Sequence, residues 1–354
     1  MGCLRLALAL AVLFSHLPDS GVRIMSGALA VQAFFIISGF YMALVLNGKY
    51  NSAGLFYSNR LLRLLPCYFA LLVASAVLLF AFQISATAPP QIFALLPARP
   101  LHLAAMAVEN LVILGQEWLF WFRVEPSSQF VLDTSGVVPG DHTTVAWQFL
   151  LVPQSWTLSM ELMFYLLVPF LARMGTRTLV GLALASIAVR QTGRLLPIDF
   201  LLWQGRFFPS ELFLFLFGML AHRALPLIAR VNRSAIWGVG LLLLQLALIG
   251  WLPRLGLRGE TNKWLIYVAV AVAIPFVFKA FANVRFDRWL GELSYPIYLA
   301  HLLVIGVVLA TGTAHTTIAI LCATLLCAAL LARYIDHPLD RWRQARVRRD
   351  IKPA

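Results

Sequence analysis

Charged residues are scarce in this 354-residue sequence, in which Asp, Glu, Lys and Arg together account for only 12% of the positions. Soluble domains usually carry about 25%. With 61% hydrophobic residues, a water-soluble fold of this length would have more apolar side chains than its core could bury. The same composition excludes intrinsic disorder. The sequence therefore predicts a polytopic membrane protein.

Cysteines and acidic residues are also few. The four cysteines lie in or beside apolar runs and resemble neither a disulfide framework nor a metal-ligand pair, so we expect them to be packing residues. The 15 acidic residues stand against 28 Lys and Arg, which gives a net charge of +13. In a membrane protein this excess is typical of cytoplasmic loops, and no nucleic-acid partner is expected. The first apolar run, residues 4–17, lacks the flanks of a cleavable signal peptide and is predicted to be the first membrane segment.

The long apolar runs predict an all-α fold with about ten transmembrane helices, since crossing a bilayer takes roughly 20 apolar residues. With both termini in the cytoplasm, 19 Lys and Arg lie inside and nine outside, as the positive-inside rule requires. The predicted helices are residues 3–18, 27–46, 64–87, 156–172, 178–190, 209–221, 234–252, 264–282, 293–311 and 316–333.

One further apolar stretch, residues 101–122, does not fit this count. If this stretch crossed the membrane, every later loop would move to the opposite side. It also carries four polar residues that are costly against lipid: Glu109, Asn110, Gln116 and Glu117. We therefore predict a re-entrant or interfacial segment on the outer face, within an outer cap formed by residues 88–155. The aromatic rings of this cap suit either a membrane-interface belt or sugar stacking.

Ionisable residues inside predicted membrane helices are expensive and therefore informative. His16 lies near the outer end of the first helix, about 16 Å along the axis from Arg5. Glu161 lies about one turn inside the helix that begins at Trp156, where a carboxylate needs a partner. A His/Glu pair could hold and deprotonate a hydroxyl. The alternative is that each polar side chain only makes hydrogen bonds between helices.

Two other segments carry similar signals. Arg60 and Arg63 are three positions apart, which places both guanidinium groups on one helical face, where they could grip phosphate. They could equally serve as cytoplasmic anchors of the third helix. Tyr298 and His301 are also three apart in a late helix, with interhelical hydrogen bonding as the alternative.

Taken together, these segments resemble the membrane acyltransferase 3 family, the O-acyltransferases that modify bacterial surface glycans. The resemblance runs from Arg5 to Arg341. Two departures are Gln32, where many members carry Asp, and Asp336, which replaces the commoner Glu. The matching motifs are Arg5 and His16 with ten residues between them, Gly27–Phe40, Arg60-Leu-Leu-Arg63 with Pro66, Trp156–Glu161 with Pro169, Leu290–His301, and Asp336-His-Pro338 with Arg341.

The resemblance implies transfer of an acyl group, usually acetyl, from cytoplasmic acyl-CoA to a glycan hydroxyl, at a bacterial cytoplasmic membrane. Acyl-CoA would be the co-substrate, with no bound cofactor or metal. The partners would be membrane lipids and a carbohydrate acceptor, which is lipid-linked in many systems. Residues 1–342 would form the transmembrane acyltransferase domain, without an SGNH domain, and residues 343–354 a basic cytoplasmic tail.

The resemblance also implies site roles. His16 would be the general base for the acceptor hydroxyl, with Glu161 orienting or charging it. Arg60 and Arg63 would grip the CoA phosphates, with Arg5 as a weaker candidate. The cavity or acceptor side would be lined by Tyr298, His301, Trp156 and Ser38. Two alternatives are a transporter or flippase of a glycan precursor, without acyl-transfer chemistry, and a non-catalytic scaffold in which the arginines are only anchors.

Overall fold

A computed structural model of the chain describes residues 1–17, 20–22, 24–46, 50, 52–85, 91–92, 100–125, 129–135, 144–231, 233–254, 259–313 and 316–351. Each of the ten predicted segments coincides with a helix. These helices are α1 (Gly2–Ser15), α2 (Gly27–Leu46), α3 (Ala53–Phe82), α5 (Trp156–Leu171), α6 (Thr176–Thr192), α8 (Phe208–Arg223), α10 (Ser234–Trp251), α11 (Glu260–Phe281), α12 (Arg285–Ala310) and α13 (Thr316–Leu331).

Within the described residues, seven spans are long and apolar enough to cross a membrane, which confirms an all-α, multi-pass membrane protein. The helices α1, α5 and α6 contain 14, 16 and 17 residues. At 1.5 Å per residue they measure about 21 to 26 Å, less than the hydrocarbon thickness of about 30 Å. The number of ten crossings therefore stays a prediction.

Two helices begin eight or more residues earlier than predicted, and both differences matter for the site. Helix α3 starts at Ala53 because the Ser52 hydroxyl accepts a hydrogen bond from the Leu55 amide at 3.2 Å, and the helix continues through Pro66. Arg60 and Arg63 therefore lie within it. Helix α12 starts at Arg285 rather than 293.

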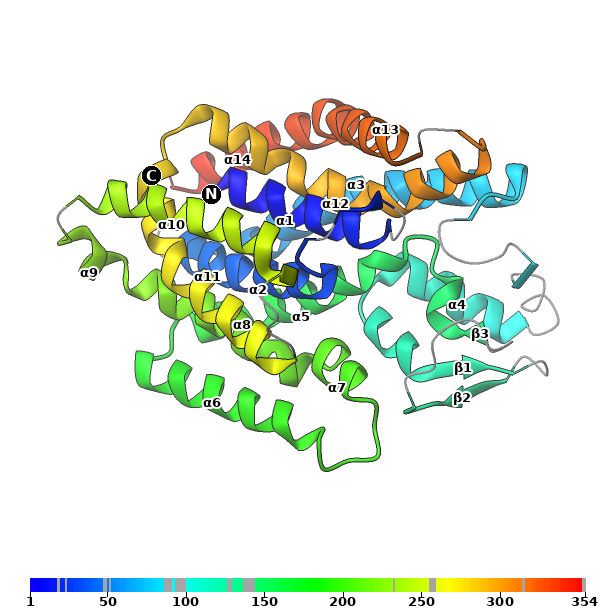
Figure 1. The fold of residues 1–354 in the computed structure, drawn as a ribbon, viewed down its shortest axis with the longest axis horizontal. Helices are drawn as coiled ribbons and strands as arrows, with labels where there is room; N and C mark the ends of the chain where they lie inside the picture. Colours follow the sequence, from blue (N-terminus) through cyan, green and yellow to red (C-terminus); the bar gives the residue numbers. More distant parts are fainter. Residues whose placement is uncertain are drawn as a thin grey trace.

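The core of the bundle depends on close helix crossings. Helices α2 and α8 meet through glycines: a Cβ atom at Gly39 would lie 1.9 Å from the Phe215 carbonyl oxygen, and one at Gly218 would lie 1.9 Å from that of Ile36. Only residues without a side chain permit this approach. Helix α1 packs along α12, so the first and one of the last helices lie side by side (Figure 1).

The apolar stretch 101–122 is broken rather than one long helix. Helix α4 (Pro100–Val112) ends where Ile113 and Gly115 take φ values of 67° and 104°, and the 3-10 helix η3 (Gln116–Trp121) follows. A small antiparallel sheet of order β2-β1-β3 comes next, which the sequence did not predict. Its strands are β1 (Phe122–Val124), β2 (Phe130–Leu132) and β3 (Thr144–Val145), followed by η4 (Ala146–Phe149) and η5 (Pro153–Ser155).

The polar residues of this stretch turn inward. Asn110, Gln116 and Glu117 are at most 7% exposed. The Asn110 side chain donates to the Phe149 carbonyl at 3.2 Å, and that of Gln116 donates to the Glu109 carbonyl at 2.8 Å. The polar side of this segment thus packs against protein, while Val108, Leu111 and Val112 on its apolar side are exposed, so the costly polar groups are kept away from lipid.

This region lies at the end of the molecule opposite to both chain termini (Figure 1). The sides of the membrane on which the termini and the cap lie stay a prediction. Residues 86–90, 93–99, 126–128 and 136–143 of the predicted cap lie outside the described residues.

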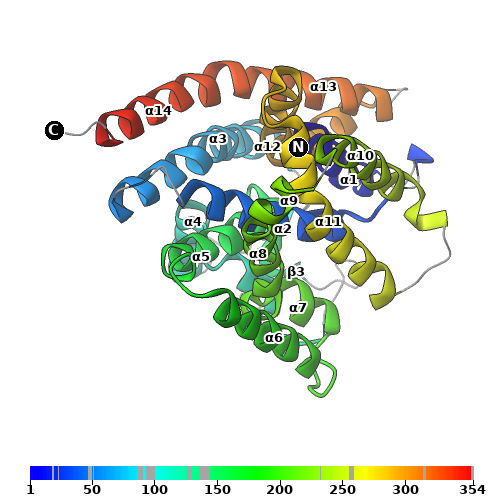
Figure 2. The same cartoon turned by 90° about the vertical axis from the view of Figure 1, so that its left-hand side faces the viewer.

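The C-terminal part is helical through the predicted boundary at residue 342. After α13 the chain makes a π-helical turn, η7 (Ala332–Asp336), and continues as α14 (His337–Ile351), which packs against α3 (Figure 2). Residues 343–351 thus belong to a helix shared with the domain, and residues 352–354 of the predicted tail lie outside the described residues. The remaining short helices are α7 (Phe200–Arg206), α9 (Leu225–Ala229) and the 3-10 helix η6 (Leu252–Arg254).

Candidate active site

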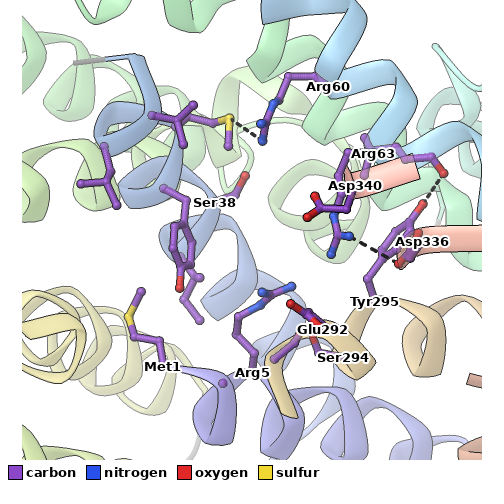
Figure 3. Close-up of a pocket in the computed structure, with 18 of the residues that line it drawn as sticks. Met1, Arg5, Ser38, Arg60, Arg63, Glu292, Ser294, Tyr295, Asp336 and Asp340 are labelled. Carbon is purple, nitrogen blue, oxygen red and sulfur yellow. Dashed lines mark hydrogen bonds and ion pairs between the residues drawn. The ribbon is translucent and has the colours of Figure 1, made fainter. Parts of the chain in front are cut away.

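A cavity of about 1120 Å³ opens between α1, α2, α3, α5, α11, α12 and α14. Six of the nine predicted site residues line it: Arg5, Ser38, Arg60, Arg63, Glu161 and Tyr298. These residues come from five helices that are distant in the sequence, and Figure 3 shows Arg5 of α1 entering the pocket from the side opposite to Arg60 and Arg63 of α3. The other three, His16, His301 and Trp156, lie outside the lining.

Glu161 is held by hydroxyl groups. Its Oε1 accepts a hydrogen bond from Ser38 Oγ at 2.8 Å and another from the Tyr165 hydroxyl at 2.5 Å. The adjacent Gly39 makes the close contact between α2 and α8. Ser38 therefore lies on the cavity side of α2, within reach of Glu161. Sequence reasoning did not identify Tyr165, although its i,i+4 spacing from Glu161 was a usable signal.

The three predicted arginines differ in their surroundings. Arg5 makes no hydrogen bond or ion pair with the residues that the structure describes. Arg60 donates to the Tyr50 hydroxyl at 3.1 Å, while its buried Nε has no partner among them. Arg63 is ion-paired with Asp336 at 3.4 Å. Arg5 and Arg60 therefore keep donors for an anion that enters the cavity.

Asp336 organises the cavity wall at the π-helical turn. Besides pairing with Arg63, it accepts a hydrogen bond from Cys67 Sγ at 3.1 Å. The ring of Tyr295 lies 5.8 Å from the Arg63 guanidinium. Turns of this kind are common at functional sites because they redirect side chains.

Helix α14 supplies basic residues that sequence reasoning did not assign to the site. Arg341, Arg343 and Arg348 line the cavity. Arg343 is 8% exposed, donates to the Asn59 carbonyl at 3.3 Å and pairs with Asp340. The sequence feature that pointed to them was the cluster of arginines after residue 340. The positive charge expected of a cytoplasmic tail seemed enough to explain that cluster.

His16 and His301 form a pair on the far side of Tyr298, with ring centroids 5.0 Å apart. The Nδ1 of His16 lies 2.9 Å from the Val12 carbonyl oxygen, and that of His301 lies 2.6 Å from the Tyr298 carbonyl oxygen. Since a carbonyl only accepts, each Nδ1 must carry the hydrogen, and the basic nitrogen of each neutral ring is Nε2. The Nε2 of His301 is buried and has no partner among the described residues.

Tyr298 connects this pair to the cavity. Its hydroxyl lies 2.8 Å from the Thr157 hydroxyl, and its ring centroid lies 5.8 Å from that of His301. The described residues show no hydrogen bond between His16 and Glu161. The expected direct His/Glu pair is thus absent from this arrangement: each partner is satisfied within its own cluster.

Trp156, the last predicted residue, packs against the guanidinium of Arg206 at 3.5 Å. No group of three or more His, Cys, Asp or Glu side chains is arranged to hold a metal ion in the described part of the chain. All four cysteines have free thiols.

These features define a multi-pass membrane protein with a basic cavity inside its helical bundle. The sequence matches the family model described as an acyltransferase domain over residues 1–333, so the chain belongs to the acyltransferase 3 family. The protein is therefore an acyltransferase. No curated protein matches the sequence, and no solved structure does.

Proposed function

We propose that this enzyme transfers an acyl group, acetyl in the simplest case, from cytoplasmic acyl-CoA to a hydroxyl group of a cell-surface or exported glycan, within a bacterial cytoplasmic membrane. The observation that supports this most is the single cavity that joins an arginine-rich end to Tyr298, beside the histidine pair. A donor and an acceptor could meet there from opposite sides of the membrane.

The chemistry of the cavity suits a phosphate-rich donor. Seven arginines and five acidic residues line it, and two of the acids, Asp336 and Asp340, are paired with Arg63 and Arg343. The volume of about 1120 Å³ is slightly above the usual range of about 300–1,000 Å³ for ligand pockets, which fits a ligand as large as a CoA thioester. The loop charges favour the cytoplasmic side for this end of the molecule.

On the acceptor side, we propose His16 as the general base. Its ring is exposed, and the Val12 carbonyl fixes the hydrogen on Nδ1, which leaves Nε2 as the base. Nε2 would take the proton of the glycan hydroxyl while the oxygen attacks the thioester carbonyl. The C–S bond then breaks, and CoA leaves as the thiolate, which recovers the proton. Glu161 would contribute from the cavity side, through its hydrogen bonds with Ser38 and Tyr165.

The test uses purified enzyme in sealed vesicles with radiolabelled acetyl-CoA and glycan from the producing organism. We expect label in the glycan with the wild type and none with His16→Ala, although that variant should still bind CoA. Movement of unlabelled glycan across the vesicle membrane without ester formation would support the transporter alternative instead.

A further inference from the structure

In the neighbourhood of Tyr298, an arginine packs against two aromatic rings. The Cζ atom of Arg206, the last residue of α7, lies 3.5 Å from the ring centroid of Trp156 and 4.1 Å from that of Phe120. Phe120 in turn stacks on Trp147, with centroids 5.3 Å apart and planes 11° from parallel. Trp156 is nearly perpendicular to Phe120, with planes 71° apart, so the guanidinium group lies in the corner between these two rings. Trp147, Phe120, Trp156 and Arg206, from η4, η3, α5 and α7, are called the aromatic stack below.

The charge of Arg206 has no partner. In the parts of the chain that the structure describes, this side chain forms no hydrogen bond or ion pair. The buried acid Glu211 is already bound by Arg190 and by the Gln32 amide at 2.9 Å. Burial lowers the pKa of Arg206 to about 10, so the group still carries its charge at neutral pH.

The contrast with Arg190 shows that the fold does pair buried arginines elsewhere. Arg190 is fully buried and binds Glu211 and the Gln204 side chain, the latter at 2.9 Å. Arg206 is instead partly exposed and held by ring faces only. Trp156 and Phe120, whose planes are 71° apart, contact the guanidinium, and no described residue accepts a hydrogen bond from its N–H groups. A guanidinium with free N–H groups can bind a carboxylate or phosphate.

The stack also lies where an acceptor would approach. Trp156 is followed by Thr157, which contacts the Tyr298 hydroxyl, and Tyr298 lies against His301. The stack does not contribute to the lining of the arginine-rich cavity. It therefore lies outside the cavity lining, next to Thr157 and Tyr298, which belong to that lining.

We propose that Arg206, Trp156 and Phe120 form an acceptor subsite for a carbohydrate that carries an oxyanion. The rings would cover apolar sugar faces, and the guanidinium would bind the anionic group. This inference deepens the proposed function and rests on it. The oxyanion could be a uronate carboxylate of the sugar or the phosphate that joins a glycan to its lipid.

The test measures binding to the full-length enzyme in nanodiscs with defined probes. Methyl glucuronide represents the uronate carboxylate of a sugar, and farnesyl pyrophosphate represents the phosphate attached to a lipid. Methyl glucoside is the uncharged counterpart of methyl glucuronide. We expect at least one anionic probe to bind more tightly than the neutral one. Arg206→Gln should weaken that probe about 10- to 100-fold, the range expected for a lost charge-assisted contact. Arg206→Lys should weaken it less.

The matched control is Arg254→Gln, because Arg254 also lies over a ring, that of Trp251 at 5.5 Å, but at an exposed position in another part of the molecule. It should bind the probe like the wild type. CoA affinity, measured on the same samples, verifies the fold and tests the donor site separately. Equal binding of the anionic probe by wild type and Arg206→Gln, with CoA binding intact, would overturn the subsite. Equal binding of charged and neutral probes would do the same.

Discussion

Replacing the cavity arginines by lysine tests whether they bind phosphate or only anchor a helix. Lysine keeps the charge but lacks the planar fork of guanidinium. Arg60 donates to the Tyr50 hydroxyl through Nη2 and contacts Met42 Sδ at 4.0 Å through Nη1, so each of these terminal nitrogens keeps a further N–H for CoA. Losing one charge-assisted hydrogen bond costs about 1.5–3 kcal/mol, so Arg60→Lys should weaken CoA binding roughly 10- to 100-fold.

Arg63 should respond differently because it already pairs with Asp336, whose side chain is only 7% exposed. A lysine can retain that pair, so we expect Arg63→Lys to weaken CoA binding by less than Arg60→Lys does. Removing the charge altogether, as in Arg63→Ala, would leave a buried carboxylate unpaired and cost about 3–5 kcal/mol of stability. Lysine is therefore the informative substitution at both positions.

Isothermal titration of CoA into detergent-purified protein measures these effects. Arg173→Lys is the control, because Arg173 is exposed beyond the end of α5 and does not line the cavity. The reasoning is refuted if Arg60→Lys binds CoA as tightly as the wild type. It is also refuted if Arg173→Lys weakens binding as much as Arg60→Lys.

Two further predictions concern stability. Burial raises the pKa of Glu117 above its ordinary value of 4.5, so the unfolded chain releases this proton at a lower pH than the folded enzyme, and stability falls as the pH rises above about 4.5. The melting temperature of Glu117→Gln, relative to wild type, should rise between about pH 4 and about pH 8; a constant difference would contradict this. Gly218→Ala should destabilise the enzyme by about 1–3 kcal/mol by separating α2 from α8. Gly240→Ala is its control because an added Cβ there meets open space, and equal chemical-denaturation midpoints for the two variants would argue against the crossing.

The helices were predictable because an apolar run of about 20 residues needs little else to specify a membrane helix. The interruption after α4 was predictable for a similar reason, since Glu109 and Glu117 are too costly against lipid. The small sheet was not, because strands of two and three residues depend on tertiary contacts rather than on a local pattern.

Within the site, the sequence indicated Arg5, Arg60 and Glu161 because charges inside apolar helices need a reason. It could not show which helices are neighbours, and for this reason His16 seemed the natural partner of Glu161. The structure provides Ser38 and Tyr165 instead. The arginines of α14 were overlooked because a basic cluster at a helix end already has an explanation in topology.

The most direct test of acyl transfer at His16 is mass spectrometry of the surface polysaccharide from the producing organism, comparing the intact gene, a deletion and His16→Ala. The account predicts that an acyl mass increment disappears in both the deletion and His16→Ala, while the variant protein still reaches the membrane. If the deletion removes the increment but His16→Ala retains it, His16 is not the base. If the deletion leaves acylation unchanged and only reduces the exported glycan, the proposed glycan acylation is contradicted.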